Sequence, residues 1–388
     1  MTTTTGSRRQ VGAAFLALAL MASACGSDDG EETRGEVTEI GDDGQAAESG
    51  SSPGSASGSA SAPAGDENAE PESTPGDGGY EYASDVVAHR LVVADICGIA
   101  DLLDVGDFAG VEAIYRDGVN SVNGDGSIRS IGGFAVGGDH LHGLDAYYGS
   151  AAPLDEFVTA ALEGTGPFEG QPDAVRAQGV EKGIQNQVMV AWVIHELASA
   201  IGKAGEGNFD VAEGAVHNWD EAWAFYHGSE PACSPFATGN MRAGNFGTFG
   251  ADGETAAANE LILAAMISGR DALLEKDPLG AEMAAADVFN AVVIIYSQAS
   301  IRYASLIDGD IAEGDLETAK VHQAEGLAFF RVIEALIAEH GGDVDAINSI
   351  YELANGPGSN GGGAAVRVAL APAWEALGIT DADIGELE

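Results

Sequence analysis

The residues best suited to chemistry lie in one stretch near the middle of the chain, residues 185–230. This stretch reads QNQVMVAWVIHELASAIGKAGEGNFDVAEGAVHNWDEAWAFYHGSE and combines imidazoles, carboxylates, a phenol and several tryptophans. The remaining chain is rich in Ala, Gly, Val and Leu. We therefore expect the function to depend on this stretch.

The first half of the stretch, residues 185–203, has the periodicity of a helix. Its apolar residues recur at helical spacing and place His195 on an apolar stripe. Glu196 follows about 100° further around the helix. Taken alone, this pair favours a hydrogen-bonded core histidine beside a surface acid over a metal site.

The second half, residues 209–226, is also predicted to be helical. Tyr226 shares an apolar face with the tryptophans, while His217, Asp220 and Glu221 form a polar face at i, i+3 and i+4 spacing. If the two helices pack antiparallel, their polar residues meet inside the bundle, where unpaired charge is costly. A shared metal ion explains such a set of carboxylates and imidazoles.

Two further groups contain candidate ligands. The segment HLHGLDAYYGS, residues 140–150, offers Tyr147 as a phenolate donor for ferric iron, although these residues also fit an exposed loop. Arginine is scarce in this chain, and Arg129 and Arg242 lie in Gly-rich loops. Because a guanidinium is well shaped to hold an oxyanion, both are candidates for anion binding.

These residues resemble a known family. VIHE, a Gly turn and WDEAWAFYHGS together are similar to the low-iron-inducible periplasmic proteins of algae, an iron-assimilation family that includes the phytotransferrins. The resemblance covers about residues 83–340 and extends to four more segments, Asp117–Ala135, Asn240–Thr248, Ser300–Ala304 and Ala324–Leu336.

The resemblance implies capture of ferric iron at the cell surface, with carbonate as a co-bound anion. The metal would be held or supported by His195, Glu196, Asp220, Glu221, Tyr226 and Tyr147, with Arg129 or Arg242 holding the anion. The chain departs from the algal members in having the start of a bacterial lipoprotein.

That start has the form of a signal peptide over residues 1–24. Arg8 and Arg9 precede an apolar run that is too short to span a membrane, and the following lipobox makes Cys25 the lipidated residue. The arginine pair also resembles a twin-arginine signal, so the export route stays open. Residues 25–78 are rich in Ser, Gly and acidic residues and predict a disordered tether. The protein is therefore expected on the outer face of the bacterial cell membrane.

Residues 79–388 are predicted to form one all-α domain. A helix–turn–helix unit occurs three times, in residues 94–115, 195–216 and 302–321, which predicts a large bundle of repeated helical hairpins. In each unit, Asp or Asn before Phe or Leu is expected to cap the second helix.

Two cysteines lie within this domain. Cys97 and Cys233 form an even pair in an exported protein, which favours a disulfide over two buried thiols.

Charge and motifs limit the function further. With 62 acidic and 16 basic residues and a formal net charge of −46, the chain has no basic patch for nucleic acid or an anionic membrane surface. His195-Glu196 lacks the second histidine of a zinc protease, and no P-loop or serine-nucleophile motif is present. We expect a non-enzymatic iron-binding lipoprotein that passes iron to a transporter. The alternatives are a metal-dependent oxidase of the helical-bundle type and a surface module that binds no metal.

Overall fold

The fold was described from a computed structural model, which describes residues 76–136, 142–358 and 361–388. Within these ranges the regular elements are helices, and the only β-structure consists of isolated bridges in loops. The predicted all-α fold class is therefore confirmed. The signal peptide, Cys25 and nearly all of the tether lie outside the described residues. The tether was predicted to extend to residue 78, but the packed structure begins slightly earlier. Asp77 is buried and forms an isolated β-bridge with Tyr80.

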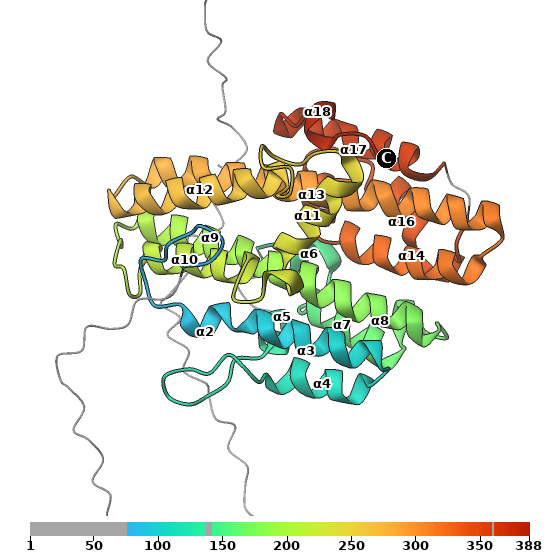
Figure 1. The fold of residues 1–388 in the computed structure, drawn as a ribbon, viewed down its shortest axis with the longest axis horizontal. Helices are drawn as coiled ribbons and strands as arrows, with labels where there is room; N and C mark the ends of the chain where they lie inside the picture. Colours follow the sequence, from blue (N-terminus) through green and yellow to red (C-terminus); the bar gives the residue numbers. More distant parts are fainter. Residues whose placement is uncertain (1–75, 137–141, 359–360) are drawn as a thin grey trace, which may run out of the picture. The chain divides into compact units, whose positions relative to one another are not determined.

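The helices follow one another through mostly short connections (Figure 1). In chain order they are α2 (Val87–Arg90), α3 (Val92–Asp104), α4 (Phe108–Asp117), α5 (Ile131–Ala135), α6 (Leu144–Tyr148), α7 (Pro153–Glu163), η2 (Gly166–Phe168), α8 (Asp173–Lys182), η3 (Gly183–Val188), α9 (Met189–Gly205), α10 (Ala215–Tyr226), η4 (Pro231–Cys233), α11 (Pro235–Phe246), α12 (Ala257–Leu274), α13 (Pro278–Glu313), α14 (Leu316–Phe330), α15 (Glu334–Glu339), α16 (Val344–Tyr351), η5 (Leu353–Asn355), α17 (Gly362–Leu377) and α18 (Asp381–Ile384).

The repeated units are pairs of packed helices: α3 with α4, α9 with α10, and α13 with α14. Asp107 and Asp315 cap α4 and α14 by accepting from backbone N–H groups of the first turn, as the sequence predicts. The expected cap at Asn208 is wrong, because α10 begins only at Ala215. Before α10 begins, the side chains of Asn208 and Asp210 accept hydrogen bonds from nearby backbone N–H groups. Such local turns compete with helix formation.

The longest helix, α13, occupies the centre of the fold. It packs against α12, α14 and α17 and also contacts α9 and α11. By length and composition alone α13 could cross a membrane, but a core helix passes the same test. Its apolar residues are largely covered by the surrounding helices, as expected for the core of a packed bundle.

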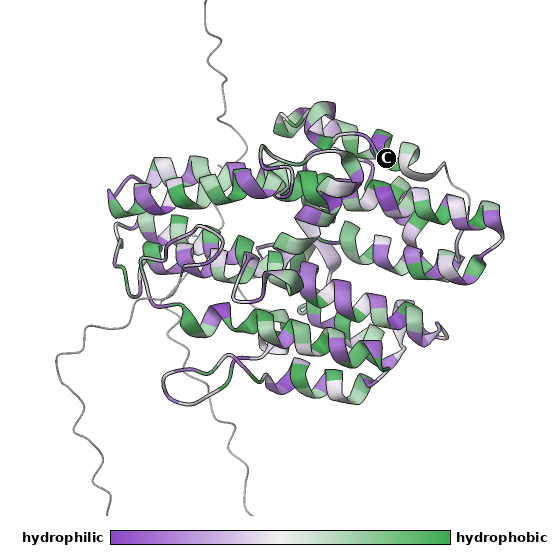
Figure 2. Cartoon of the chain, viewed as in Figure 1, coloured by the Kyte–Doolittle hydropathy of each residue, from purple (hydrophilic) through white to green (hydrophobic). Residues whose placement is uncertain are grey.

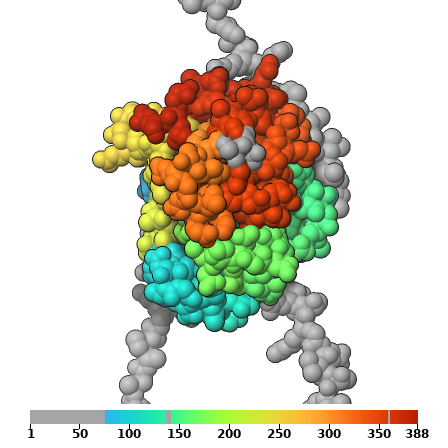
Figure 3. All heavy atoms as spheres, turned by 90° about the vertical axis from the view of Figure 1, so that its right-hand side faces the viewer, coloured from blue at the N-terminus to red at the C-terminus, as the bar shows by residue number. Residues whose placement is uncertain are grey.

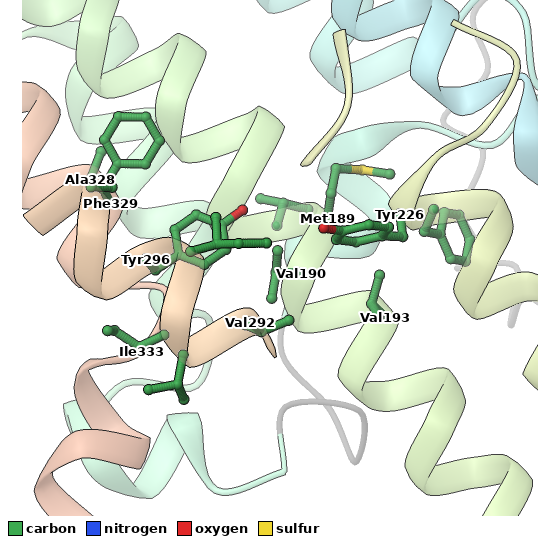
Figure 4. Close-up of a cluster of buried hydrophobic side chains, with 14 of the residues drawn as sticks. Met189, Val190, Val193, Tyr226, Val292, Tyr296, Ala328, Phe329 and Ile333 are labelled. Atoms are coloured by element: carbon green, nitrogen blue, oxygen red, sulfur yellow. The ribbon is translucent and has the colours of Figure 1, made fainter. Parts of the chain in front are cut away.

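One hydrophobic core runs through the hairpins. Figure 4 shows Val190 of α9 and Tyr226 of α10 facing Val292 and Tyr296 of α13, with Phe329 of α14 beyond them. Figure 2 shows hydrophobic and hydrophilic residues interleaved along the same helices, the pattern of amphipathic helices. In the view of Figure 3, the C-terminal helices lie beside α13 and α14, and α8 separates them from the N-terminal helices.

Two contacts fix α10 and its surroundings within this core. Trp219 of α10 packs so closely on α12 that a Cβ added at Gly269 would lie 1.9 Å from its ring. At the end of α10, a disulfide joins Cys97 of α3 to Cys233 of η4, with a sequence separation of 136 residues. The same region is therefore held by close packing and by a covalent link.

The close packing predicts opposite effects for two alanine substitutions in helices. Gly269→Ala should lower the free energy of unfolding by about 1–3 kcal/mol, because Trp219 must move. Gly309→Ala on α13 should raise it by about 0.5–1 kcal/mol, because that Cβ meets nothing within 4 Å and alanine favours the helix. Urea unfolding of both variants measures the difference, and equal midpoints would contradict the close approach of α10 and α12.

The disulfide predicts a redox-dependent stability. Closing so long a loop restricts the unfolded chain, so replacing both cysteines by alanine should cost about 4 kcal/mol. Urea unfolding with and without a reductant checks this, since reduction should shift the midpoint of the native protein and leave that of the double variant unchanged. A native midpoint indifferent to reductant would mean that the bridge does not form.

Candidate metal centre

Glu221 places a buried carboxylate between two histidines. Its Oε1 lies 2.9 Å from Nε2 of His89 and 3.0 Å from Nε2 of His217. Glu221 is 7% exposed, and both imidazoles are largely covered. One ligand atom from each residue lies within 4.8 Å of the other two, so a small adjustment brings all three onto one metal ion.

The helical geometry of α10 brings two of these groups together. His217 and Glu221 are four residues apart and therefore lie on the same face of α10. His89 comes from α2 and contacts the ring of Phe225, also on α10, at 5.8 Å between centroids. Phe134 and Trp192 pack on Phe225 as well, so one side of the centre is apolar.

A second carboxyl group, from Glu196 of α9, faces Glu221. Asn218 bridges the pair, with its Nδ2 donating to Glu196 Oε2 at 2.5 Å and to Glu221 Oε2 at 3.4 Å. Burial, together with the charge of Glu221, raises the pKa of Glu196 well above its ordinary value. Burial also acts to raise the pKa of Glu221, but hydrogen bonds from His217 and His89 outweigh it and hold that pKa well below the ordinary value. The pKa values of the two acids are thus shifted in opposite directions, and Glu196 is the more readily protonated of the pair.

The imidazole of His217 responds to the same carboxylate. Burial alone would lower its pKa, but the hydrogen bond and the charge of Glu221 raise it above the ordinary value. Nδ1 of His217 and Nδ1 of His89 are buried and have no hydrogen-bond partner within the described part of the chain. Both rings therefore contact the centre through Nε2 alone.

Arg129 brings a positive charge to this centre from the loop before α5. Burial lowers the pKa of its guanidinium, while the charges of Glu221, Asp125 and Glu196 act to raise it. Its Nη1 is buried and makes no hydrogen bond to any described residue. An unpaired buried N–H group of this kind can bind an anion or a water molecule.

Asp220, the residue before Glu221 on α10, acts as an anchor for the segment that leads to His89. Its two carboxylate oxygens accept from the Tyr80 hydroxyl at 2.6 Å, from the Ser84 hydroxyl at 2.7 Å, and from the backbone N–H groups of Ala83 and Ser84. The ion pair between Arg90 and Asp77 fixes the next turn. These contacts position α2, and with it His89, against α10.

The structure brings together three of the residues proposed from the sequence: Glu196, Glu221 and Arg129. It places the others elsewhere. Tyr226 donates to Asn259 at 2.5 Å inside the core. Nδ1 of His195 lies 2.9 Å from Nε2 of His142, with its ring against Trp192.

Tyr147 and Arg242 also lie away from Glu221. Tyr147 is partly exposed and donates to Glu334 of α15 at 3.2 Å. Arg242 of α11 is buried and packs over the rings of Tyr303 and Phe329 in the neighbouring hairpin.

Sequence reasoning missed His89 and did not place His217 among the proposed ligands. The i, i+4 spacing of His217 and Glu221 on the polar face of α10 could have identified His217 as a ligand. His89 lies about a hundred residues upstream in a short helix, and nothing local marks it as a ligand. Only the tertiary anchor at Asp220 brings it to the centre.

Fold and centre together define an all-α protein with a buried cluster of two histidines and a carboxylate suited to a transition metal. A family model, low iron-inducible periplasmic protein, matches residues 56–388. The chain belongs to this family, as the resemblance predicted, and the match begins within the predicted tether. Comparison with curated proteins and with solved structures gives no match.

The anchoring contacts predict that Asp220→Asn is costly although it changes few atoms. The new amide must oppose either the three donors at Oδ2 or the Tyr80 hydroxyl, so we expect a loss of about 3 kcal/mol in the free energy of unfolding. Asp101→Asn, at an exposed site on α3, is the matched control and should change stability by less than about 0.5 kcal/mol. If the two variants unfold at similar urea concentrations, Asp220 does not anchor this segment.

Proposed function

We propose that this protein binds iron for acquisition, and that His89, His217 and Glu221 hold the ion. The observation that carries the proposal is the buried Glu221 carboxylate with two imidazole nitrogens at about hydrogen-bonding distance. Imidazole and carboxylate together are ligands of iron in proteins. The family description, low iron-inducible periplasmic protein, agrees with a role in iron assimilation.

Glu196 and Asn218 complete the centre. Glu196 lies beside Glu221 and can become a further ligand by losing its proton, while Asn218 orients both carboxyl groups. Of the residues proposed from the sequence, this arrangement keeps Glu196 and Glu221 and assigns no contact with the metal to His195, Asp220, Tyr226 or Tyr147.

Arg129 is the proposed anion ligand. Its buried, unpaired Nη1 near Glu221 supports a bound oxyanion, and the resemblance names carbonate as that anion. Ferric iron with carbonate is the form that the resemblance predicts. The oxidation state of the bound iron is a separate property that depends on the ligand atoms.

The setting of the protein completes the proposal. Lipidation at Cys25 would attach it to the outer face of the cell membrane, and residues 25–78 would serve as the tether. A transporter would receive the iron. These proposals rest on the sequence, and we favour binding over catalysis because the family is described by its response to low iron.

Replacing one histidine of the centre tests the site. His217→Ala should weaken iron binding by at least about tenfold, because it removes a ligand atom. His322→Ala is the matched control: it removes a partly buried histidine that pairs with Asp310 in the α13–α14 hairpin, and it should leave affinity unchanged. Isothermal titration of the folded chain measures both, and circular dichroism verifies that each variant is folded. Equal affinity in the His217→Ala variant and the native protein would place the metal elsewhere.

A further inference from the structure

We propose that the iron bound between His89, His217 and Glu221 is ferrous, so that the protein takes up divalent iron. This inference rests on the proposed function, since it concerns the same centre. Two imidazole nitrogens and one carboxylate are the protein donor set of non-haem ferrous sites. A ferric ion instead favours anionic oxygen donors, and phenolate is the strongest of these among side chains.

The tyrosines of the chain are all engaged away from this centre. The sequence contains nine tyrosines, and every one of their hydroxyl groups donates to an acceptor other than His89, His217, Glu196 or Glu221. The acceptors are Asp220 for Tyr80, Asp77 for Tyr82, Asp155 for Tyr115, Glu334 for Tyr147 and Tyr148, Asn259 for Tyr226, Asn186 for Tyr296, Glu325 for Tyr303 and the Ser300 carbonyl for Tyr351.

Recruiting a phenolate would therefore break an existing contact and ionise a buried phenol. Tyr226, the tyrosine that sequence reasoning placed nearest the acids, is fully buried in the core and donates to an uncharged amide. Burial also raises its pKa above the ordinary value. Ionising Tyr226 would leave a negative charge among apolar side chains, which is costly.

The positive charge of Arg129 also favours a divalent ion over a trivalent one. When no anion is bound to it, a guanidinium that interacts with Glu221 and Glu196 also repels a metal ion held there, and the repulsion grows with the charge of the ion. Among the three grouped ligands, Glu221 is the one that offers a carboxylate to the metal. A divalent ion is better balanced by this set than a trivalent one.

Among the residues that the structure describes, no thiolate is available to change this preference. Cys97 and Cys233 are joined in a disulfide, so neither offers a thiolate to a metal. The ligand atoms of the described centre are therefore nitrogen and oxygen, which suit ferrous iron and other divalent ions of intermediate softness.

The test compares the two oxidation states on the same protein. Fe²⁺ is titrated without oxygen, in competition with a ferrous chelator, and Fe³⁺ is titrated in competition with citrate, each with and without bicarbonate. We expect Fe²⁺ to bind at least about tenfold more tightly than Fe³⁺, a difference of about 1.4 kcal/mol. His217→Ala should weaken Fe²⁺ binding at least about tenfold, whereas Tyr147→Phe should leave it unchanged.

Each outcome has a separate meaning. Tighter binding of Fe³⁺ in either buffer, or an intense visible absorption band of a ferric phenolate, would overturn the ferrous assignment and leave iron binding itself intact. A loss of Fe³⁺ affinity in Tyr147→Phe would overturn it in the same way. If neither ion binds, the proposed function fails as well.

Discussion

The centre depends on one constraint, the cost of keeping the Glu221 carboxylate charged inside a helical bundle. Burial opposes the charge, and the two imidazole N–H groups of His89 and His217 offset that cost. For the second acid, Glu196, burial and the charge of Glu221 raise the pKa, which favours its protonated form. A cation bound here would take the place of the imidazole N–H groups beside the Glu221 carboxylate. The buried carboxylate is therefore suited to a metal ion.

The neighbouring hairpin solves the same problem in a different way. In α13 and α14, Glu325 is half-buried and accepts a hydrogen bond from the Tyr303 hydroxyl at 3.0 Å. Arg242 and Arg302 both pack on the Tyr303 ring, so fixed cations lie near this carboxyl group. The repeated hairpin thus provides one scaffold, and the side chains around its acidic residue differ between the two copies: imidazoles at Glu221, and a phenol with nearby guanidinium groups at Glu325.

The sequence allowed the helical fold and the hairpin repeats to be predicted, because both follow from local periodicity. It also singled out Glu196 and Glu221, which the structure places close together. The i, i+4 relation of His217 and Glu221 is likewise local. His195 and Asp220 were misplaced for a physical reason: on a helix buried on nearly all sides, periodicity identifies a face but not its partner. Asp220 faces the backbone of residues 80–84, a contact between distant segments that no spacing in the sequence records.

This long-range contact gives the N-terminal segment a part in the centre. The chain enters the described fold near Asp77, is held to α10 by Asp220, and supplies His89 only a few residues later. The disulfide then fixes α3, the next helix, to the loop after α10. His89 is therefore held between two restraints, so that the ligand most distant in sequence reaches Glu221 without relying on its own short helix. Because α2 has only four residues, its position depends on these tertiary contacts, and any metal affinity contributed by His89 depends on them too.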